Sequence, residues 1–225
     1  MTTVDLTQTS VRDLNQALHD LPNDASGAWE ITNAKGQHAL AVGLDAPIDV
    51  TIKGHAGYYA AGMNKHANVV VEGNVGVGVA ENMMSGRVHV KGHASQSAGA
   101  TSQGGMLVID GDAAARCAIS MKGSNIVVKG SVGHMSCFMG QSGRFVICGD
   151  AGDALGDSMY EVRIYVKGTV KSLGADVIEK EMRAEHLEEL TALLAEAGAD
   201  EDASNFKRYG SARNLYTFHI DNAKL

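Results

Sequence analysis

The sequence predicts an all-β solenoid, a single-stranded parallel β-helix of about seven 19-residue coils. Short segments rich in β-branched residues end in glycine and recur at a constant step of 19 residues, which is the signature of a solenoid. Aromatic residues are only 5% of 225, so the core must be narrow and built from small side chains. The segments VTIKG, VVVEG, VHVKG, LVIDG, IVVKG, FVICG and IYVKG end at Gly54, Gly73, Gly92, Gly111, Gly130, Gly149 and Gly168.

Fixed positions of the repeat predict which side chains point into the tube. Alternate residues of a strand share a face, so the first and third residues of each segment, such as Val69 and Val71, are expected inside. The second residue after each glycine is Ala or Val, which fits an inward corner. The fourth residue changes sign between many neighbouring coils, as from Lys53 to Glu72, and opposite charges facing across a ladder add about 0.2–1 kcal/mol.

The seven recurring glycines are interpreted as corner residues, able to take φ values that other residues resist. The alternative is a phosphate-binding loop, because a strand followed by a glycine-rich turn begins many nucleotide sites. Residues 76–81 read GVGVAE, which lacks the last glycine of GxGxxG, and the chain has no Gly-Lys-Ser/Thr. The glycines are therefore predicted to be structural corner residues and not part of a phosphate-binding loop.

The second residue of each segment should point outward, yet it is mostly apolar. This column contains Val70, Val108, Val127, Val146 and Tyr165. A bare tube would leave the stripe in water, so either a C-terminal helix over residues 177–197 or another protein must cover it. We expect the helix of the same chain to do so.

The two ends differ from the coils and predict three regions. Residues 1–45 contain a helix that begins after Ser10 and ends before Pro22, and a hairpin whose turn is at 33–36. The β-helix is assigned to residues 46–173. Residues 174–225 comprise a helix ending at Gly198 and an aromatic tail over 205–220. Both ends are expected to cap the solenoid, whose terminal coils would otherwise expose unpaired strand edges.

Side chains capable of chemistry do not assemble into a recognisable site, and no catalytic, cofactor-binding or metal-binding residue is predicted. His55 and His93 occupy the same position two coils apart, roughly 9–10 Å, which is too far for one metal ion. They belong to a column of polar turn residues that satisfy local backbone groups. A pair between His134 and Cys137 is conceivable, but a structural role is favoured.

The remaining sulfur-containing side chains have structural explanations too. Cysteines 117, 137 and 148 lack metal-site spacing and are expected to be small buried fillers. Methionines gather on the return side of the coils, either filling irregular loops or forming an adaptable contact surface for a partner. These methionines are Met83, Met84, Met121, Met135, Met139 and Met159.

Composition narrows the classes of partner. A net charge of −7 gives the chain no electrostatic reason to bind nucleic acid or an anionic membrane. No apolar stretch approaches the length of a membrane span, and the N-terminus does not resemble a secretory signal. Three cysteines without CxxC spacing favour a reducing, cytoplasmic location.

The repeat and its loops resemble the GXGXG β-helix domain of the glutamate synthase large subunit. The stretches GHAGYYAAGMN, GVGVAENMMSGRVHVKG, SAGATSQGGMLVIDGDA, MKGSNIVVKGSVGHMS and GDALGDSMYEVRIYVKG carry the resemblance, which covers residues 38–175. It implies a right-handed β-helix without catalytic residues, packed between a glutamine-hydrolysing domain and an FMN and iron–sulfur domain.

As a separate chain, the sequence is similar to the stand-alone β-helix subunit of split enzymes such as N-methylglutamate synthase, the methylamine–glutamate N-methyltransferase. The resemblance implies a non-catalytic scaffold in a hetero-oligomeric transferase complex of methylamine metabolism. The partners would be a glutamine-amidotransferase-like subunit and a synthase subunit that carries FMN and an iron–sulfur cluster. The corresponding subunit of a split, ammonia-using glutamate synthase is the nearest alternative.

Two further classes of solenoid remain as alternatives. A left-handed β-helix acyltransferase is built from six-residue units, and 19 is not a multiple of six. A self-assembling structural filament requires ends that stack on one another, whereas this chain has distinct helical and aromatic ends.

Overall fold

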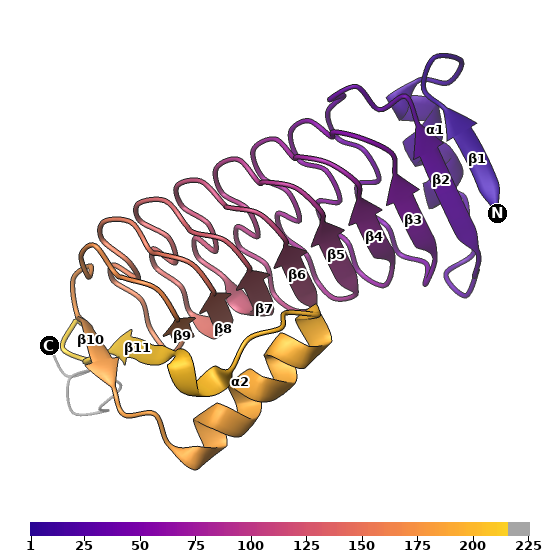
Figure 1. The fold of residues 1–225 in the computed structure, drawn as a ribbon. Helices are drawn as coiled ribbons and strands as arrows, with labels where there is room; N and C mark the ends of the chain where they lie inside the picture. The colour runs from indigo at the N-terminus through magenta and orange to yellow at the C-terminus, as the bar shows by residue number, and fades with distance from the viewer. Residues whose placement is uncertain (216–225) are drawn as a thin grey trace, which may run out of the picture.

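The computed structural model, which describes residues 1–215, is a rod of stacked coils with one helix lying along its C-terminal half (Figure 1). One sheet of 11 strands runs along the rod in the order β1-β2-β3-β4-β5-β6-β7-β8-β9-β11-β10. Strands β1 to β9 each pair in parallel with their sequence neighbours, which confirms the predicted parallel β-solenoid. The coil strands are β3 (Asp49–Ile52), β4 (Asn68–Val71), β5 (Arg87–Val90), β6 (Met106–Ile109), β7 (Lys122–Val128), β8 (Ser142–Ile147) and β9 (Arg163–Val166).

The register of the sheet follows the sequence period. Val50 is opposite Val69, and Val69 is opposite Val88, so each coil strand from β4 onward is displaced by 19 residues from the one before. A shift in β7 and β8 interrupts this step, where Lys122 is opposite Ser142. A second column of parallel bridges begins at Ala56 and Val75, two residues after the corner glycine of each coil. The inward columns are buried as predicted, with Val69 1% exposed and Val71 fully covered.

The N-terminal end contains β1 (Thr2–Asp5), α1 (Val11–His19) and β2 (Ala28–Thr32). Helix α1 confirms the predicted helix, because the Ser10 hydroxyl accepts a hydrogen bond from the Asp13 N–H at 3.1 Å. Its apolar face buries Leu14 and Leu18 against the first coils. The end of the solenoid is therefore covered by an amphipathic helix.

The predicted N-terminal hairpin is wrong. Strand β2 pairs in parallel with β1 and β3, and residues 37–44 form no strand. Instead, the Gly36 N–H donates to the His55 carbonyl at 2.9 Å, and the Gly43 N–H donates to the Gly62 carbonyl at 2.8 Å. Residues 33–48 thus form the return side of an additional coil. After the turn, the chain hydrogen-bonds to the next coil and does not fold back to pair with β2.

The C-terminal end contains β10 (Val177–Lys180), α2 (Ala184–Ala197), the short 3₁₀ helix η1 (Ala203–Asn205) and β11 (Lys207–Ser211). The helix predicted from residue 177 is corrected, since its first residues form β10, which pairs antiparallel with β11. Gly198 ends α2 with φ 64°, as predicted. The aromatic tail begins as β11, which pairs antiparallel with β9, and its part at 216–220 lies outside the described residues.

Helix α2 covers the outer apolar stripe of the C-terminal coils, as predicted (Figure 1). Val108, Val127, Val146 and Tyr165 are fully buried in a second hydrophobic cluster with Leu190, Leu193 and Leu194 of α2. Val70, in the same column of β4, lies outside this cluster and stays partly exposed. The apolar cover therefore reaches β6 to β9, whereas the outward residues of β3 to β5 stay partly exposed.

The return side of the coils has a recurring backbone conformation. In the coil between β7 and β8, Met135, Cys137 and Met139 have φ of 54°, 62° and 51°, in the left-handed region. The same three positions are left-handed in the neighbouring coils, and Gly78, Gly99 and Gly156 occupy some of them. Hydrogen bonds between coils stabilise these residues, as from the Met135 N–H to the Asp153 carbonyl at 2.7 Å.

Candidate functional site

The column of polar residues after the corner glycines forms a continuous ladder between coils. His55 Nδ1 accepts from the Asn74 N–H, Asn74 Oδ1 accepts from the His93 N–H, and His93 Nδ1 accepts from the Asp112 N–H, each at 2.9 Å. In the neutral form each imidazole therefore carries its proton on Nε2. The prediction that these histidines satisfy backbone groups is confirmed.

The ladder continues with other side chains towards the C-terminal end. Asp112 accepts from the Ser131 N–H at 2.8 Å, Ser131 Oγ accepts from the Asp150 N–H at 3.0 Å, and Asp150 accepts from the Thr169 N–H at 2.7 Å. The hydrogen bond from Thr169 lowers the pKa of the Asp150 carboxyl. Histidine, asparagine, aspartate and serine thus perform one structural task at equivalent positions.

Glycine is required at the corners of the coils for a different physical reason from the predicted one. Of the seven, only Gly54 has a positive φ, of 93°. At Gly73 a Cβ atom would lie 2.7 Å from the backbone of Gly54, and at Gly111 it would lie 2.7 Å from Nδ1 of His93. The preceding coil and its ladder side chain occupy the space of a side chain, so close stacking requires glycine.

The three cysteines are buried, as predicted. Cys117 and Cys137 are fully covered, and Cys148 is 7% exposed. Burial raises the pKa of the Cys117 thiol to about 12 and that of Cys148 to about 11, and it raises the pKa of Cys137 as well. A thiol with a raised pKa is a poor nucleophile and a poor metal ligand at neutral pH.

The methionines of the return side differ in burial, and so do His134 and Cys137. Met83, Met121 and Met159 fill the tube, whereas Met84 and Met139 are 44% and 41% exposed. The filling of the tube by methionine is therefore confirmed, and the contact surface for a partner stays a prediction. His134 is exposed while Cys137 is buried, and no hydrogen bond joins them.

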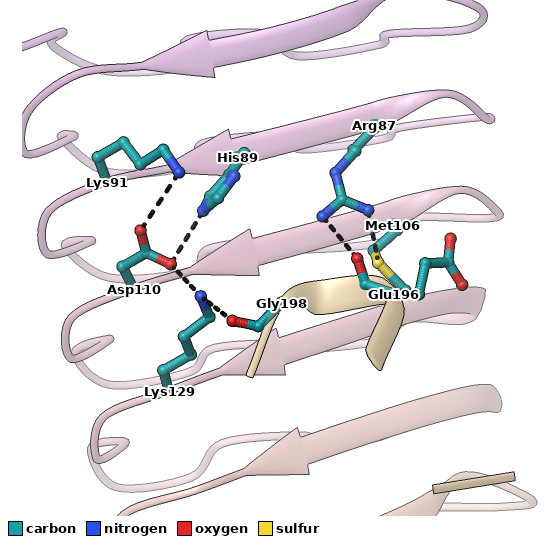
Figure 2. Close-up of polar contacts among 8 residues, drawn as sticks. All are labelled: Arg87, His89, Lys91, Met106, Asp110, Lys129, Glu196 and Gly198. Carbon is teal, nitrogen blue, oxygen red and sulfur yellow. Dashed lines mark hydrogen bonds and ion pairs between the residues drawn. The ribbon is translucent and has the colours of Figure 1, made fainter. Parts of the chain in front are cut away.

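A polar cluster lies where the C-terminal end of α2 meets strands β5 to β7 (Figure 2). His89 Nε2 is 2.9 Å from the Asp110 carboxylate, which also pairs with Lys129 at 2.8 Å and Lys91 at 3.7 Å. Burial raises the pKa of Asp110, but hydrogen bonds from Lys129 and His89 outweigh it and leave that pKa below its usual value. Burial lowers the pKa of His89 despite the carboxylate beside it.

This cluster resembles part of a catalytic triad but lacks the nucleophile. Within residues 1–215, the only hydrogen-bond partner of the His89 ring is Asp110, so no hydroxyl or thiol of these residues is hydrogen-bonded to it as a nucleophile would be. The cluster instead holds α2. Lys129 donates to the Gly198 carbonyl and Arg87 donates to the Glu196 carbonyl, both at 3.0 Å (Figure 2). Cations at the last carbonyls stabilise a helix C-terminus.

A second anchor holds the first half of α2. The Glu189 carboxylate accepts hydrogen bonds from Arg144 at 2.7 Å, Arg163 at 2.8 Å and the Tyr165 hydroxyl at 2.7 Å. Burial raises the pKa of Glu189, but these three donors outweigh it, so that its pKa is lowered overall. Burial and Glu189 both raise the pKa of Tyr165. Sequence reasoning missed this anchor, although a lone glutamate on the sheet-facing side of a predicted helix was a usable signal.

The described part of the chain offers neither a metal site nor a membrane span. Within residues 1–215, no group of three or more His, Cys, Asp or Glu side chains is arranged to hold a metal ion. Neither described helix has the length and apolarity that crossing a membrane would require. The polar side chains of greatest interest are those that connect coils and fix α2.

Together these features define the class as a helix-covered parallel β-solenoid, in which ladders of side chains join the coils. No family model matches the sequence. The chain is 59% identical over 225 residues to the curated "Protein GlxC" of Rhizobium meliloti (strain 1021), and the match covers 99% of each chain. The chain therefore belongs to the GlxC family.

Proposed function

We propose that the chain is a non-catalytic scaffold subunit of a glutamate-synthase-like complex. The proposal rests on one observation: the histidine and cysteine side chains that could take part in catalysis have structural roles instead. His55 and His93 accept backbone hydrogen bonds between coils, the three thiols are buried, and the His89–Asp110 pair helps to anchor α2. A solenoid whose side chains are engaged in this way offers a long, rigid surface against which catalytic subunits can pack.

The particular complex proposed is N-methylglutamate synthase, which makes N-methylglutamate and ammonia from methylamine and glutamate. The proposal rests on the stretches within residues 38–175 that resemble the GXGXG domain. In this complex the chain would bridge a glutamine-amidotransferase-like subunit and a synthase subunit that holds FMN and an iron–sulfur cluster. Its own residues would supply stability and position, in the reducing cytoplasm expected from the sequence.

Co-expression tests the proposal. The chain would be affinity-purified with the products of neighbouring reading frames, and the complex would be identified by mass spectrometry. We expect a glutaminase-like protein and an FMN-containing protein to co-purify with it. We also expect N-methylglutamate to form only when all subunits are present. The chain purified alone should show no flavin absorbance and no turnover.

The outcomes separate the candidates. Formation of glutamate from ammonia, without use of methylamine, would assign the chain to a split glutamate synthase instead. Tight flavin binding or turnover by the isolated chain would contradict a scaffold role. Filaments of the isolated chain in electron micrographs would favour a self-assembling protein, and acyl transfer by the chain alone would favour the acyltransferase class.

A further inference from the structure

A polar pocket of about 600 Å³ lies at the C-terminal end of the rod, where β9, β10 and β11 meet the first turn of α2. Five basic side chains and two carboxylates line it, in a chain whose net charge is −7. The basic side chains are Arg163, Lys180, Arg183, Arg208 and Arg213. The local charge is thus opposite in sign to that of the whole chain.

Strand pairing brings like charges together in this pocket. Lys180 of β10 lies directly opposite Arg208 of β11, and like charges facing each other destabilise an antiparallel pair. No hydrogen bond or ion pair joins the Lys180 ammonium to residues 1–215, and Arg208 uses only Nε, which donates to the Glu181 carbonyl at 3.0 Å. The terminal nitrogens of Arg208 therefore stay available as a two-pronged donor.

Burial and repulsion show that this arrangement of charges costs free energy. Burial lowers the pKa of the Arg208 guanidinium, and the charges of Arg163 and Arg183 act in the same direction. An anion between these groups would reverse the repulsion. The arrangement is therefore one that a bound anion would stabilise.

A buried histidine adds a further donor. His186 is 5% exposed, lines the pocket and accepts the Arg183 N–H on Nδ1 at 3.2 Å. Burial and the Arg208 charge lower the pKa of His186, so the ring is neutral at pH 7 and carries its proton on Nε2. No described residue accepts that proton. The first turn of α2, which begins at Ala184, adds the positive end of the helix dipole.

We propose that this pocket binds a small metabolite through an oxyanion group, a phosphate or clustered carboxylates. Lys180, the free nitrogens of Arg208 and the His186 Nε2–H are the proposed ligands of that group. The pocket volume of about 600 Å³ suits a small molecule, and its polar walls suit an anion better than an apolar ring. The site lies apart from the ladder and from the Lys129 anchor, it shares only Arg163 with the Glu189 anchor, and it does not depend on the scaffold function.

Titration calorimetry on the isolated full-length chain tests the inference, with inorganic phosphate and citrate as probes at matched ionic strength. We expect one binding site for at least one probe, with a Kd of about 1 mM or lower. Lys180→Gln should weaken binding about fivefold or more, because it removes a charge without breaking a hydrogen bond within residues 1–215. The matched control is Lys122→Gln, since Lys122 is exposed at the start of β7, and it should leave the Kd within about twofold.

Arg208→Gln should also weaken binding, and Arg208→Lys should restore only part of the affinity, because lysine lacks the planar fork. Circular dichroism and the melting temperature check that each variant is folded. Several results would overturn the inference. They are no binding of either probe, equal weakening by Lys122→Gln, binding of an acidic hexapeptide in preference to both probes, or binding only to a chain ending at Leu215.

Discussion

The two halves of the sheet share one repeat but differ on their outer face. In β6 to β9 the outward column is apolar and fully buried under α2, as at Val127 and Val146. In β3 to β5 the same column contains Thr51, Val70 and His89, which are partly exposed to solvent. The inward columns do not change between the halves. The repeat therefore determines the tube, and the covering element determines the outer residues.

The ladder from His55 to Thr169 runs through both halves, but charged side chains beside the outer column serve partly different purposes. Where the face is bare, charges pair between neighbouring coils, as Lys53 does with Glu72 at 2.8 Å. Where the face is covered, charged groups connect the sheet to the helix, as Arg144 does with Glu189. Exposed pairs of the first kind contribute little, whereas part-buried hydrogen-bonded pairs of the second kind fix the position of an element.

The largest expected effect distinguishes the halves directly. Val127→Asp would place a carboxylate beneath α2 without a partner, and we expect a loss of about 4 kcal/mol or more in the free energy of unfolding. Val70→Asp, at the same position of the bare half, should cost less than about 1 kcal/mol. Urea unfolding of the two variants measures both values. Equal losses would show that α2 does not cover Val127 in solution.

A second prediction concerns a feature that both halves share. Gly73→Ala in the bare half and Gly149→Ala in the covered half should each destabilise the protein by about 1–3 kcal/mol, because a Cβ atom meets the preceding coil at either site. It would lie 2.7 Å from Gly54 at the first site and 2.5 Å from Ser131 Oγ at the second. Chemical denaturation would contradict this explanation if either variant were as stable as the parent chain.

The anchor at Glu189 should contribute less than the apolar cover. Glu189→Gln removes the charge that Arg144 and Arg163 share, and we expect a loss of about 1–2 kcal/mol, limited because both arginines are partly exposed. Because the folded pKa of Glu189 is lowered, its contribution is present above the unfolded pKa near 4.3 and is lost as pH falls through the folded pKa. Comparing the unfolding free energies at pH 7 and pH 4 checks both statements, and the difference between parent and Glu189→Gln should shrink at pH 4.

The smallest effect concerns His89, at the boundary between the halves. Burial lowers the pKa of His89 in the folded chain. Below about pH 6.5 the imidazole is therefore protonated in the unfolded chain but still neutral in the folded chain. The free energy of unfolding should therefore decrease as pH falls from 6.5 through the folded pKa. His89→Gln should remove part of this decrease, by less than about 1 kcal/mol, in unfolding measured at pH 7.0 and pH 5.5. A pH dependence identical to that of the parent chain would exclude His89 as its source.

Sequence reasoning predicted those features that depend on the period. The inward residues Val69 and Val71, the cap Ser10, the helix end Gly198 and the cover of the apolar stripe were all predicted, because each leaves a local or periodic pattern.

Features that depend on a stacked neighbour were not predicted. The turn at 33–36 gave no sign of which segment its return side would pair with, so an extra coil was taken for a hairpin. Backbone freedom was the predicted reason for glycine at the corners, whereas the structure shows that atoms of the preceding coil leave no room for a side chain there. The helix pattern marked Glu189 as facing the sheet, but the partners of this anchor are 24 to 45 positions away in the sequence, so no local pattern identified them.

The central claim is that the chain is a frame whose reactive-looking side chains are structural. Replacing His55 and His93 together by asparagine tests it, because Asn74 already fills the same ladder position with its Oδ1. In the complex reconstituted with its partners, we expect turnover within about twofold of the parent complex and an unchanged melting temperature of the chain. A loss of turnover of about a hundredfold, with the fold and assembly intact, would show catalytic imidazoles and contradict the account.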